Sequence, residues 1–548
     1  MEAVGLRGGS RRPSRRCGVH TSIADGKIRF GSAAGVRGHN DRRNLGASGA
    51  NAGAFPSPRL PMNMKPISFR CAVAALALFS VDAAAMTLNV AGAWTNKCSS
   101  PEKPELAFYS RQSETLLFEA GDSVTIYCQS GVKALGLAWS LHRNMVKTPF
   151  LTGTAEALPS NLFKIPVDTA RLPPGFYDLR VQLDVGLPKT LDGVCVFGWE
   201  AGKMPLRETR PADFRAFWDK ALAEYAKIPL DAKIEGEAKI FKGGEIDDYL
   251  TLSACLPPTP YDPQGIKTDE VESFKISFAG PDGGRVYAWL AKPRGDGPFP
   301  AMLVLPGAGF NARARPLEHA RHGFLAIDIQ VHGQDVDLPK YEHLPGYDDD
   351  AVVYEPAEKN RMMNVYLRAV RAVDYLCSRT DVDRGRIVTV GGSQGGRLSL
   401  VVPALDHRIA ATVPGIPWGA NYPGLAWSAR CNGVGNPEDK SWRPGYVFGP
   451  KSDGMAMTDA PPQPDTPAAK CGAYYDPMNF APDVKCPVFM NAGLIDYISP
   501  PSHIWAAYLR LGSQDKTLTP LPGLGHDWSA EFDRRAWRWL DSRLGAGK

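Results

Sequence analysis

One serine of the chain lies in a turn that four glycines make unusually tight. The stretch GGSQGG places Ser393 directly after the apolar run Ile387–Val390 and directly before RLSLVV. The first run is typical of a short buried strand, and the second is typical of the apolar start of a helix. Side chains would clash in so tight a strand-to-helix turn, and positive φ angles are expected there. A serine exposed on a strained turn suits nucleophilic attack; the alternative is an ordinary serine in a glycine-rich turn.

Two further residues have the types and positions that would decide between these interpretations. A serine nucleophile needs a base that takes its proton and an acid that orients the base. Asp496 follows the apolar run Val488–Ala492, and His526 follows the run Thr517–Leu521. The order Ser, Asp, His, with each residue after a strand, favours a triad in which Ser393 attacks, His526 is the base and Asp496 orients it.

Acyl transfer also needs two donors for the negatively charged oxygen that develops on the carbonyl. We expect one donor to be the backbone N–H of Gln394, whose side chain we interpret as structural. The other should come from the glycine-rich loop PGAGF, from the N–H of Ala308 or alternatively of Gly309. Three other histidines lie outside the loop in which the triad order places the base, and we interpret them as bystanders: His319, His322 and His332.

Composition limits the class of protein. The chain has 548 residues, 44% hydrophobic and 22% charged, which is ordinary for a soluble protein of two or three domains. The net charge of +5 is uneven, because residues 1–63 carry ten arginines and one lysine against three acids. With that +8 and the +1 of residues 64–85 removed, residues 86–548 carry −4. Because this part is mildly acidic, we expect no nucleic-acid partner. No cysteine or histidine cluster has metal-site spacing, so no metal is expected, and no organic cofactor is implied.

The amino-terminal part has the pattern of an export signal. Residues 64–85 begin with two cations, continue with the apolar run Cys71–Val81 and end in AAA, which predicts signal-peptide cleavage near Ala85. The run is too short for a stable membrane anchor, so a periplasmic or extracellular protein is expected. Residues 1–63 lack periodicity and are either disordered or the product of a mistaken start site upstream of the signal.

Eight cysteines follow the predicted cleavage point, and an even number in an exported protein permits disulfides without fixing their connectivity. Cys431 and Cys471 flank one Pro/Gly-rich segment and are the first candidate pair. Cys377 lies in a helical pattern and Cys486 borders a strand, so we expect both to be buried thiols.

Two patterns of elements follow the signal. Residues 86–203 contain short alternating segments such as Phe176–Leu183 without helices, which predicts a small immunoglobulin-like β-sandwich. This domain could be a carbohydrate-binding module or a structural spacer, and we favour the spacer. Residues 204–548 alternate strands with helices, as in Phe324–Ile329 followed by Asn360–Ser378. This alternation predicts an α/β fold with a doubly wound, mostly parallel sheet covered by helices on both faces.

One long insert interrupts the second pattern. Residues 418–475 read as a loop rich in aromatic residues, and such inserts are usually functional or disordered. Their rings could stack on sugars, so Trp418, Tyr422 and Trp427 are candidate substrate contacts. Packing of the insert against itself is the alternative.

Residues 206–548 contain a series of separated motifs: DFRAFWDKALAE, PGAGFN followed by HGQD, AVDYLCSRTDVDRGRI running into GGSQGG, YYDPMNFAPDVKCPV, GLIDYISPPS and GHDW. With these motifs the segment resembles the acetyl xylan esterase/cephalosporin-C deacetylase family of α/β-hydrolases. The resemblance implies an α/β-hydrolase fold, the triad Ser393, Asp496 and His526, and oxyanion donors at Gln394 and Ala308. It also implies a homo-oligomer, although the additional β domain could block that contact.

The chain departs from the family pattern in three motifs. The family's Arg-Gly-Gln is His332-Gly333-Gln334, its tyrosine in the oxyanion loop is Ala308, and its His-Glu is His526-Asp527. The first change could alter a supporting contact, and the second alters one wall of the pocket.

From the triad and the resemblance we hypothesise an exported serine esterase that deacetylates acetylated xylan, xylo-oligosaccharides or another small ester. The rivals are a prolyl-oligopeptidase-like peptidase and a non-catalytic polysaccharide-binding protein on a hydrolase scaffold.

Overall fold

The computed structural model describes most of the chain after residue 105. The described ranges are 106–146, 148–188, 190–252, 263–342, 356–421, 467–527 and 529–544, with the short strands β1 (Ile23–Ala24), β2 (Lys27–Ile28) and β3 (Trp94–Thr95). The chain divides into two units, Met1–Ala77 and Leu78–Lys548, and every element from β3 onward belongs to the second unit. The predicted signal at 64–85 lies outside the described residues and stays a prediction.

The first part of this second unit is built from two five-stranded sheets. One has the order β3-β4-β6-β10-β9, with β4 Leu106–Tyr109, β6 Thr125–Ser130, β10 Leu162–Pro166 and β9 Glu156–Leu158. The other has the order β5-β12-β11-β7-β8, with β5 Leu117–Phe118, β12 Leu191–Trp199, β11 Gly175–Asp184, β7 Gly136–Arg143 and β8 Leu151–Thr154. Along β11, Leu179, Val181 and Leu183 are buried at every second position, as one face of a strand requires. The predicted all-β character of this region is thus observed.

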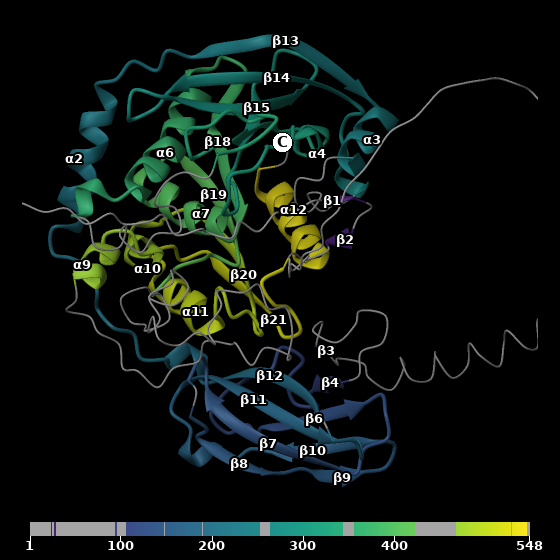
Figure 1. The fold of residues 1–548 in the computed structure, drawn as a ribbon. Coiled ribbons are helices and arrows are strands. Elements are labelled where there is room, and N and C mark those ends of the chain that lie inside the picture. The colour runs from purple at the N-terminus through teal and green to yellow at the C-terminus, as the bar shows by residue number, and fades with distance from the viewer. Residues whose placement is uncertain are drawn as a thin grey trace, which may run out of the picture. The chain divides into compact units, whose positions relative to one another are not determined.

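The second part contains a nine-stranded sheet (Figure 1). Its order is β13-β14-β15-β17-β16-β18-β19-β20-β21. The strands are β13 Lys233–Lys242, β14 Glu270–Ala279, β15 Arg285–Pro293, β16 Phe299–Val304, β17 Leu325–Ile329, β18 Val382–Gly392, β19 Ile409–Gly415, β20 Val488–Gly493 and β21 Lys516–Leu521. Every neighbouring pair from β17 to β21 is parallel, which places the carboxyl ends of these six strands along one edge.

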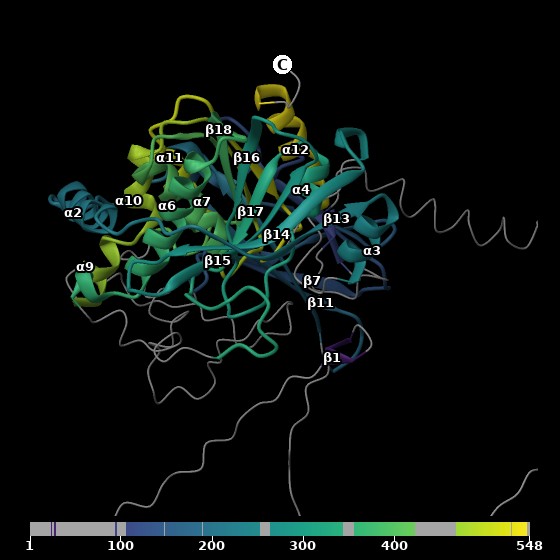
Figure 2. The same ribbon diagram turned by 90° about the horizontal axis from the view of Figure 1, so that it is seen from above.

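Helices cover this sheet on both faces. They are α2 Phe214–Ala226, α3 Gly244–Leu252, α4 Leu317–Arg321, α6 Met362–Ser378, α7 Gln394–Leu405, α9 Pro467–Ala473, α10 Pro477–Phe480, α11 Pro501–Arg510 and α12 Ala530–Leu544. Figure 2 shows α6, α7 and α11 on one side of the sheet and α4 and α12 on the other. Among the described residues, none of these helices has the length and apolar composition that crossing a bilayer requires.

Neighbouring residues of the central strands belong to different cores. On β16, Met302 packs into the cluster that contains Trp537 of α12, whereas Leu303 packs into the larger cluster beneath α6 and α7. On β18, Ile387 and Val388 divide in the same way. Because both faces are buried, these strands are continuously apolar. The doubly wound, mostly parallel α/β sheet predicted from that pattern is confirmed, and it agrees with the α/β-hydrolase fold that the resemblance implies.

The sequence did not reveal the antiparallel strands β13, β14 and β15. Strand β13 is an edge strand with lysine or glutamate at half of its exposed positions, so it lacks a clear apolar pattern. Helix α9 lies within the segment predicted to be a loop, 418–475, and corrects that prediction at its end. Its buried residues, such as Ala469 and Cys471, are small and give a weak apolar signal. Residues 422–466 lie outside the described ranges.

The cysteines also require a correction. Cys471 is a buried thiol whose Sγ accepts a hydrogen bond from Asn360 Nδ2 at 3.4 Å, but its predicted partner Cys431 lies outside the described residues. That pairing stays a prediction. Cys377 and Cys486 are thiols as expected, yet each is only partly buried, because one lies in the last turn of α6 and the other in the turn before β20.

Candidate active site

Ser393 occupies the junction of β18 and α7 in a strained backbone conformation. Its φ is 58° and its ψ is −116°, in a region that residues with a side chain rarely adopt. The sequence led us to expect positive φ among the surrounding glycines, but in this turn only Ser393 has it. The strain therefore falls on the serine itself, whose backbone N–H donates to the Gly415 carbonyl at 3.0 Å.

The glycines of the turn permit close approach of backbone rather than unusual angles. A Cβ on Gly395 would lie 2.2 Å from the carbonyl oxygen of Leu305, at the end of β16. A Cβ on Gly396 would lie 2.2 Å from the carbonyl oxygen of Gly415, at the end of β19. Gly392 by contrast faces open space. The first turn of α7 is thus wedged between the ends of the two neighbouring strands, which fixes the position of the serine.

The structure brings together the three side chains of the predicted triad. His526 Nε2 lies 2.9 Å from Ser393 Oγ, and His526 Nδ1 lies 2.9 Å from Asp496 Oδ2. The other oxygen of Asp496 accepts the backbone N–H groups of Ile498 and Ser499, both at 2.8 Å. These two bonds hold the carboxylate in one orientation, and the histidine ring is aligned between acid and hydroxyl.

The environment of His526 favours its charged form. Burial by itself lowers the pKa of this imidazole, but the charge and hydrogen bond of Asp496, with the charge of Asp527, outweigh burial and raise the pKa above its ordinary value. The His526 side chain is 13% exposed and that of Asp496 is fully buried. An imidazole with this partner can take up a proton from the serine and hold it.

The two predicted oxyanion donors lie on adjoining segments. Gln394 is the first residue of α7, where backbone N–H groups point out of the helix and the helix dipole favours negative charge. Ala308 lies in the loop after β16. The Gln394 side-chain amide donates to the Gly307 carbonyl at 3.4 Å, so the Gln394 side chain links the two segments, consistent with the structural role expected for it.

Of the predicted substrate contacts, only Trp418 can be located. Its backbone N–H donates to the Ser393 carbonyl at 3.0 Å, and the Arg397 guanidinium lies 5.0 Å from its ring centroid. The indole is half-buried next to the serine turn. Tyr422 and Trp427 lie outside the described residues.

One of the three histidines interpreted as bystanders, His332, lies beside the serine turn. The His332 ring contacts the Gln394 side chain. His526 occupies the position of the base, so the interpretation of His332 as a bystander in the proton transfer stays a prediction. His332 follows β17, and its place after a parallel strand was the signal that could have revealed this contact. His319 and His322 instead pack against Trp537 of α12, with ring centroids 5.5 and 4.3 Å away.

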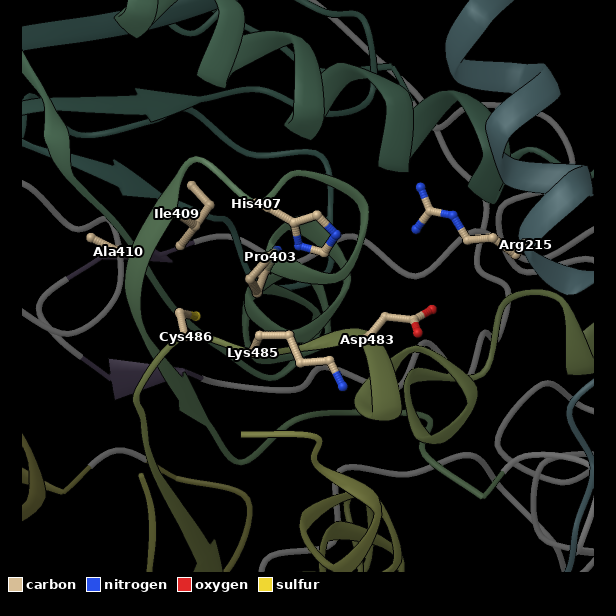
Figure 3. Close-up of a pocket in the computed structure, with 8 residues that line it drawn as sticks. All are labelled: Arg215, Pro403, His407, Ile409, Ala410, Asp483, Lys485 and Cys486. Atoms are coloured by element: carbon tan, nitrogen blue, oxygen red, sulfur yellow. The ribbon is translucent and has the colours of Figure 1, made fainter. Parts of the chain in front are cut away.

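A pocket of about 540 Å³ lies at the opposite edge of the sheet (Figure 3). Ile409, the first residue of β19, forms part of its wall, whereas the last residue of that strand accepts the Ser393 N–H. Its remaining lining comes from α2, from the end of α7 and the turn after it, from β19 and from the segment before β20: Arg215, Pro403, His407, Ala410, Asp483, Lys485 and Cys486. An ester bound there could not reach the serine. Within the described ranges, no group of three or more His, Cys, Asp or Glu side chains is arranged to hold a metal ion.

Comparison with known proteins agrees with the family that the sequence resembles. A family model described as acetyl xylan esterase (AXE1) matches residues 251–432 and 455–543. Acetyl esterase Axe7A of Xylanibacter ruminicola is 28% identical over 384 residues, which cover 68% of this chain and 75% of that protein.

Two solved structures are similar over about three fifths of this chain. An acetyl xylan esterase from Paenibacillus sp. R4 is 25% identical, with 63% of this chain and 98% of that chain covered and a TM-score of 0.46. Acetyl xylan esterase 1 from Thermoanaerobacterium sp. JW/SL YS485 is 22% identical, with 62% and 96% covered and a TM-score of 0.45. By the family model and the relative, the chain is a serine carboxylic ester hydrolase similar to the acetyl xylan esterases.

Proposed function

We propose that the protein is an exported esterase that removes acetyl groups from acetylated xylan or xylo-oligosaccharides through Ser393, His526 and Asp496. The observation that carries the mechanism is the continuous hydrogen-bonded chain from Asp496 through His526 to the Ser393 hydroxyl, with both links at 2.9 Å. An ordinary glycine-rich turn would not need this alignment of groups from three separate strand ends.

In the acylation step, Ser393 Oγ attacks the carbonyl carbon of the ester while His526 Nε2 takes the hydroxyl proton. The buried Asp496 carboxylate stabilises the imidazolium that forms. The negatively charged carbonyl oxygen is stabilised by the backbone N–H groups of Gln394 and Ala308. His526 then gives its proton to the departing alcohol oxygen, which leaves an acetyl group on the serine.

In the deacylation step, water replaces the alcohol. His526 takes a proton from the water as its oxygen attacks the acyl carbon, and the same two N–H groups stabilise the second oxyanion. Return of the proton from His526 to Ser393 Oγ releases acetic acid and restores the enzyme.

Acetylated polysaccharide is proposed as substrate because matched proteins are named acetyl xylan esterase or acetyl esterase. The sequence pattern of residues 64–85 agrees with such a substrate, since polysaccharides are met outside the cell. Trp418, half-buried beside the serine turn, is the described aromatic residue that we propose to border the bound substrate.

The substrate proposal is tested by measuring acetate released from acetylated xylo-oligosaccharides, beside matched 4-nitrophenyl esters of acetic, butyric and octanoic acid. We expect kcat/KM to fall as the acyl chain lengthens and acetate release to vanish in Ser393→Ala. Preference for octanoate, or cleavage of prolyl peptide amides in place of esters, would overturn it.

Export and assembly are tested separately. We expect protein recovered from outside the cytoplasm to begin near Met86, as amino-terminal sequencing would measure. The resemblance implies a homo-oligomer. The mass of the protein in solution gives its oligomeric state and tests this implication. A single-chain mass at micromolar concentration would contradict it.

A further inference from the structure

His332 lies between the two halves of the predicted oxyanion hole. Its ring is 7% exposed and follows β17. On one side it meets the Phe310 ring edge to face, with centroids 4.9 Å apart. On the other side its Nε2 lies 3.3 Å from Nε2 of Gln394. Phe310 is two residues beyond Ala308, so His332 contacts both segments that supply a donor.

The hydrogen bonds of the Gln394 side-chain amide indicate the tautomer of His332. The side-chain amide nitrogen of Gln394 carries two hydrogens, one directed at the Gly307 carbonyl oxygen and the other at His332 Nε2. A nitrogen that only donates requires an acceptor, so His332 Nε2 is unprotonated and the ring is the neutral Nδ1–H tautomer. The reverse amide orientation would place its oxygen against the Gly307 carbonyl oxygen.

The surroundings keep His332 neutral. Burial, followed by the charges of Arg361, Arg368 and Arg313, lowers the pKa of His332 to about 3. The imidazole is therefore an acceptor at any pH at which His526 can act as a base. The family pattern has an arginine at this position. Its guanidinium carries five donors and no acceptor, so it could not accept a hydrogen bond from the Gln394 amide.

We propose that His332 is a positioning residue that sets the spacing of the two oxyanion donors through the Gln394 side chain, an inference that rests on the proposed function of Ser393. The contact reaches both sides of the gap in which the oxyanion forms. Since the oxyanion exists only near the transition state, a change in this spacing affects kcat and leaves KM nearly unchanged.

The test compares full-length variants with 4-nitrophenyl acetate as the probe. His332→Phe keeps a ring against Phe310 and removes the acceptor, and we expect kcat to fall by about 10- to 100-fold with KM within about twofold, less than the loss of a whole donor. His332→Gln supplies an oxygen at the reach of Nε2 and should restore most of kcat. His332→Arg should not.

The matched control is His319→Phe. His319 is also buried, its pKa is likewise lowered to about 3 by burial and by the charge of His322, and it packs on Trp537. We expect His319→Phe to lower the melting temperature without changing kcat. Equal kcat values in His332→Phe and His319→Phe, or no recovery in a folded His332→Gln, would overturn the inference.

A second measurement separates this inference from the substrate proposal. The rate at which diethyl 4-nitrophenyl phosphate modifies Ser393, followed by intact mass, requires the serine and the oxyanion donors but no sugar or acetyl group. Slower modification in His332→Phe, with recovery in His332→Gln, supports the inference even if the wild-type protein releases no acetate from xylo-oligosaccharides. Unchanged modification rates contradict it.

Discussion

The two edges of the nine-stranded sheet hold polar side chains in different arrangements. At the carboxyl edge, Ser393, His526 and Asp496 come from three strand ends and form one directed chain of hydrogen bonds. At the amino edge, two charged groups that line the 540 Å³ pocket are held in ion pairs: Asp483 with Arg210 at 2.7 Å, and Arg215 with Asp219 at 2.6 Å.

This difference shows that the volume of a pocket does not indicate whether its side chains can carry out a reaction. Partly exposed ion pairs are worth about 0–1 kcal/mol and perform no proton transfer. At the carboxyl edge, a strained serine backbone and a buried carboxylate held by two backbone amides orient one imidazole. Strain and directed hydrogen bonds, rather than volume, therefore mark the site.

The largest expected effect is at the nucleophile. Ser393→Ala removes the attacking oxygen and should lower kcat by about 10⁴- to 10⁶-fold on acetyl esters. His407→Ala, in the amino-edge pocket, should leave kcat within about twofold. If His407→Ala rather than Ser393→Ala abolished ester hydrolysis, the active site would have to lie at the amino edge of the sheet.

Loss of the orienting carboxylate comes next. Asp496→Asn removes the charge that stabilises the imidazolium and favours the wrong tautomer of His526, so kcat should fall by about 10³- to 10⁴-fold. Steady-state kinetics with 4-nitrophenyl acetate measures this change. A fall of less than tenfold would mean that another group orients the base.

Crowding at the serine turn gives a smaller effect. Gly395→Ala places a methyl group 2.2 Å from the Leu305 carbonyl oxygen, so the turn must move. We expect the free energy of unfolding to fall by about 1–3 kcal/mol and kcat to drop with it. Gly392→Ala, which meets no atom within 4 Å, is the stability control in urea denaturation. Equal losses would show that the close approach is not what requires glycine.

The smallest effect concerns pH. The charge of Asp527 helps to raise the pKa of His526, and the base acts only when neutral. Asp527→Asn lowers this pKa, so the acidic limb of kcat/KM should move to lower pH while the plateau changes little. A shift of that limb to higher pH would contradict the electrostatic assignment.

The candidate site could be predicted largely because its signals are local. Ser393 is marked by adjacent glycines, and Asp496 and His526 each follow an apolar strand of recognisable length. Parallel strands then bring such strand-end residues to a common edge without further information. The polar edge strand β13 and the small helix α9 lack a local apolar pattern, and both were missed for that reason.

What sequence determined by itself was the fold class and the set of residues available for acyl transfer, because both are written in periodicity and in short motifs. Only the tertiary structure decided that the backbone strain falls on Ser393, that Gly392 is not crowded, and that His332 lies against Gln394. Each of these depends on where chain segments far apart in sequence lie relative to one another, and this placement leaves no periodic signal in either segment.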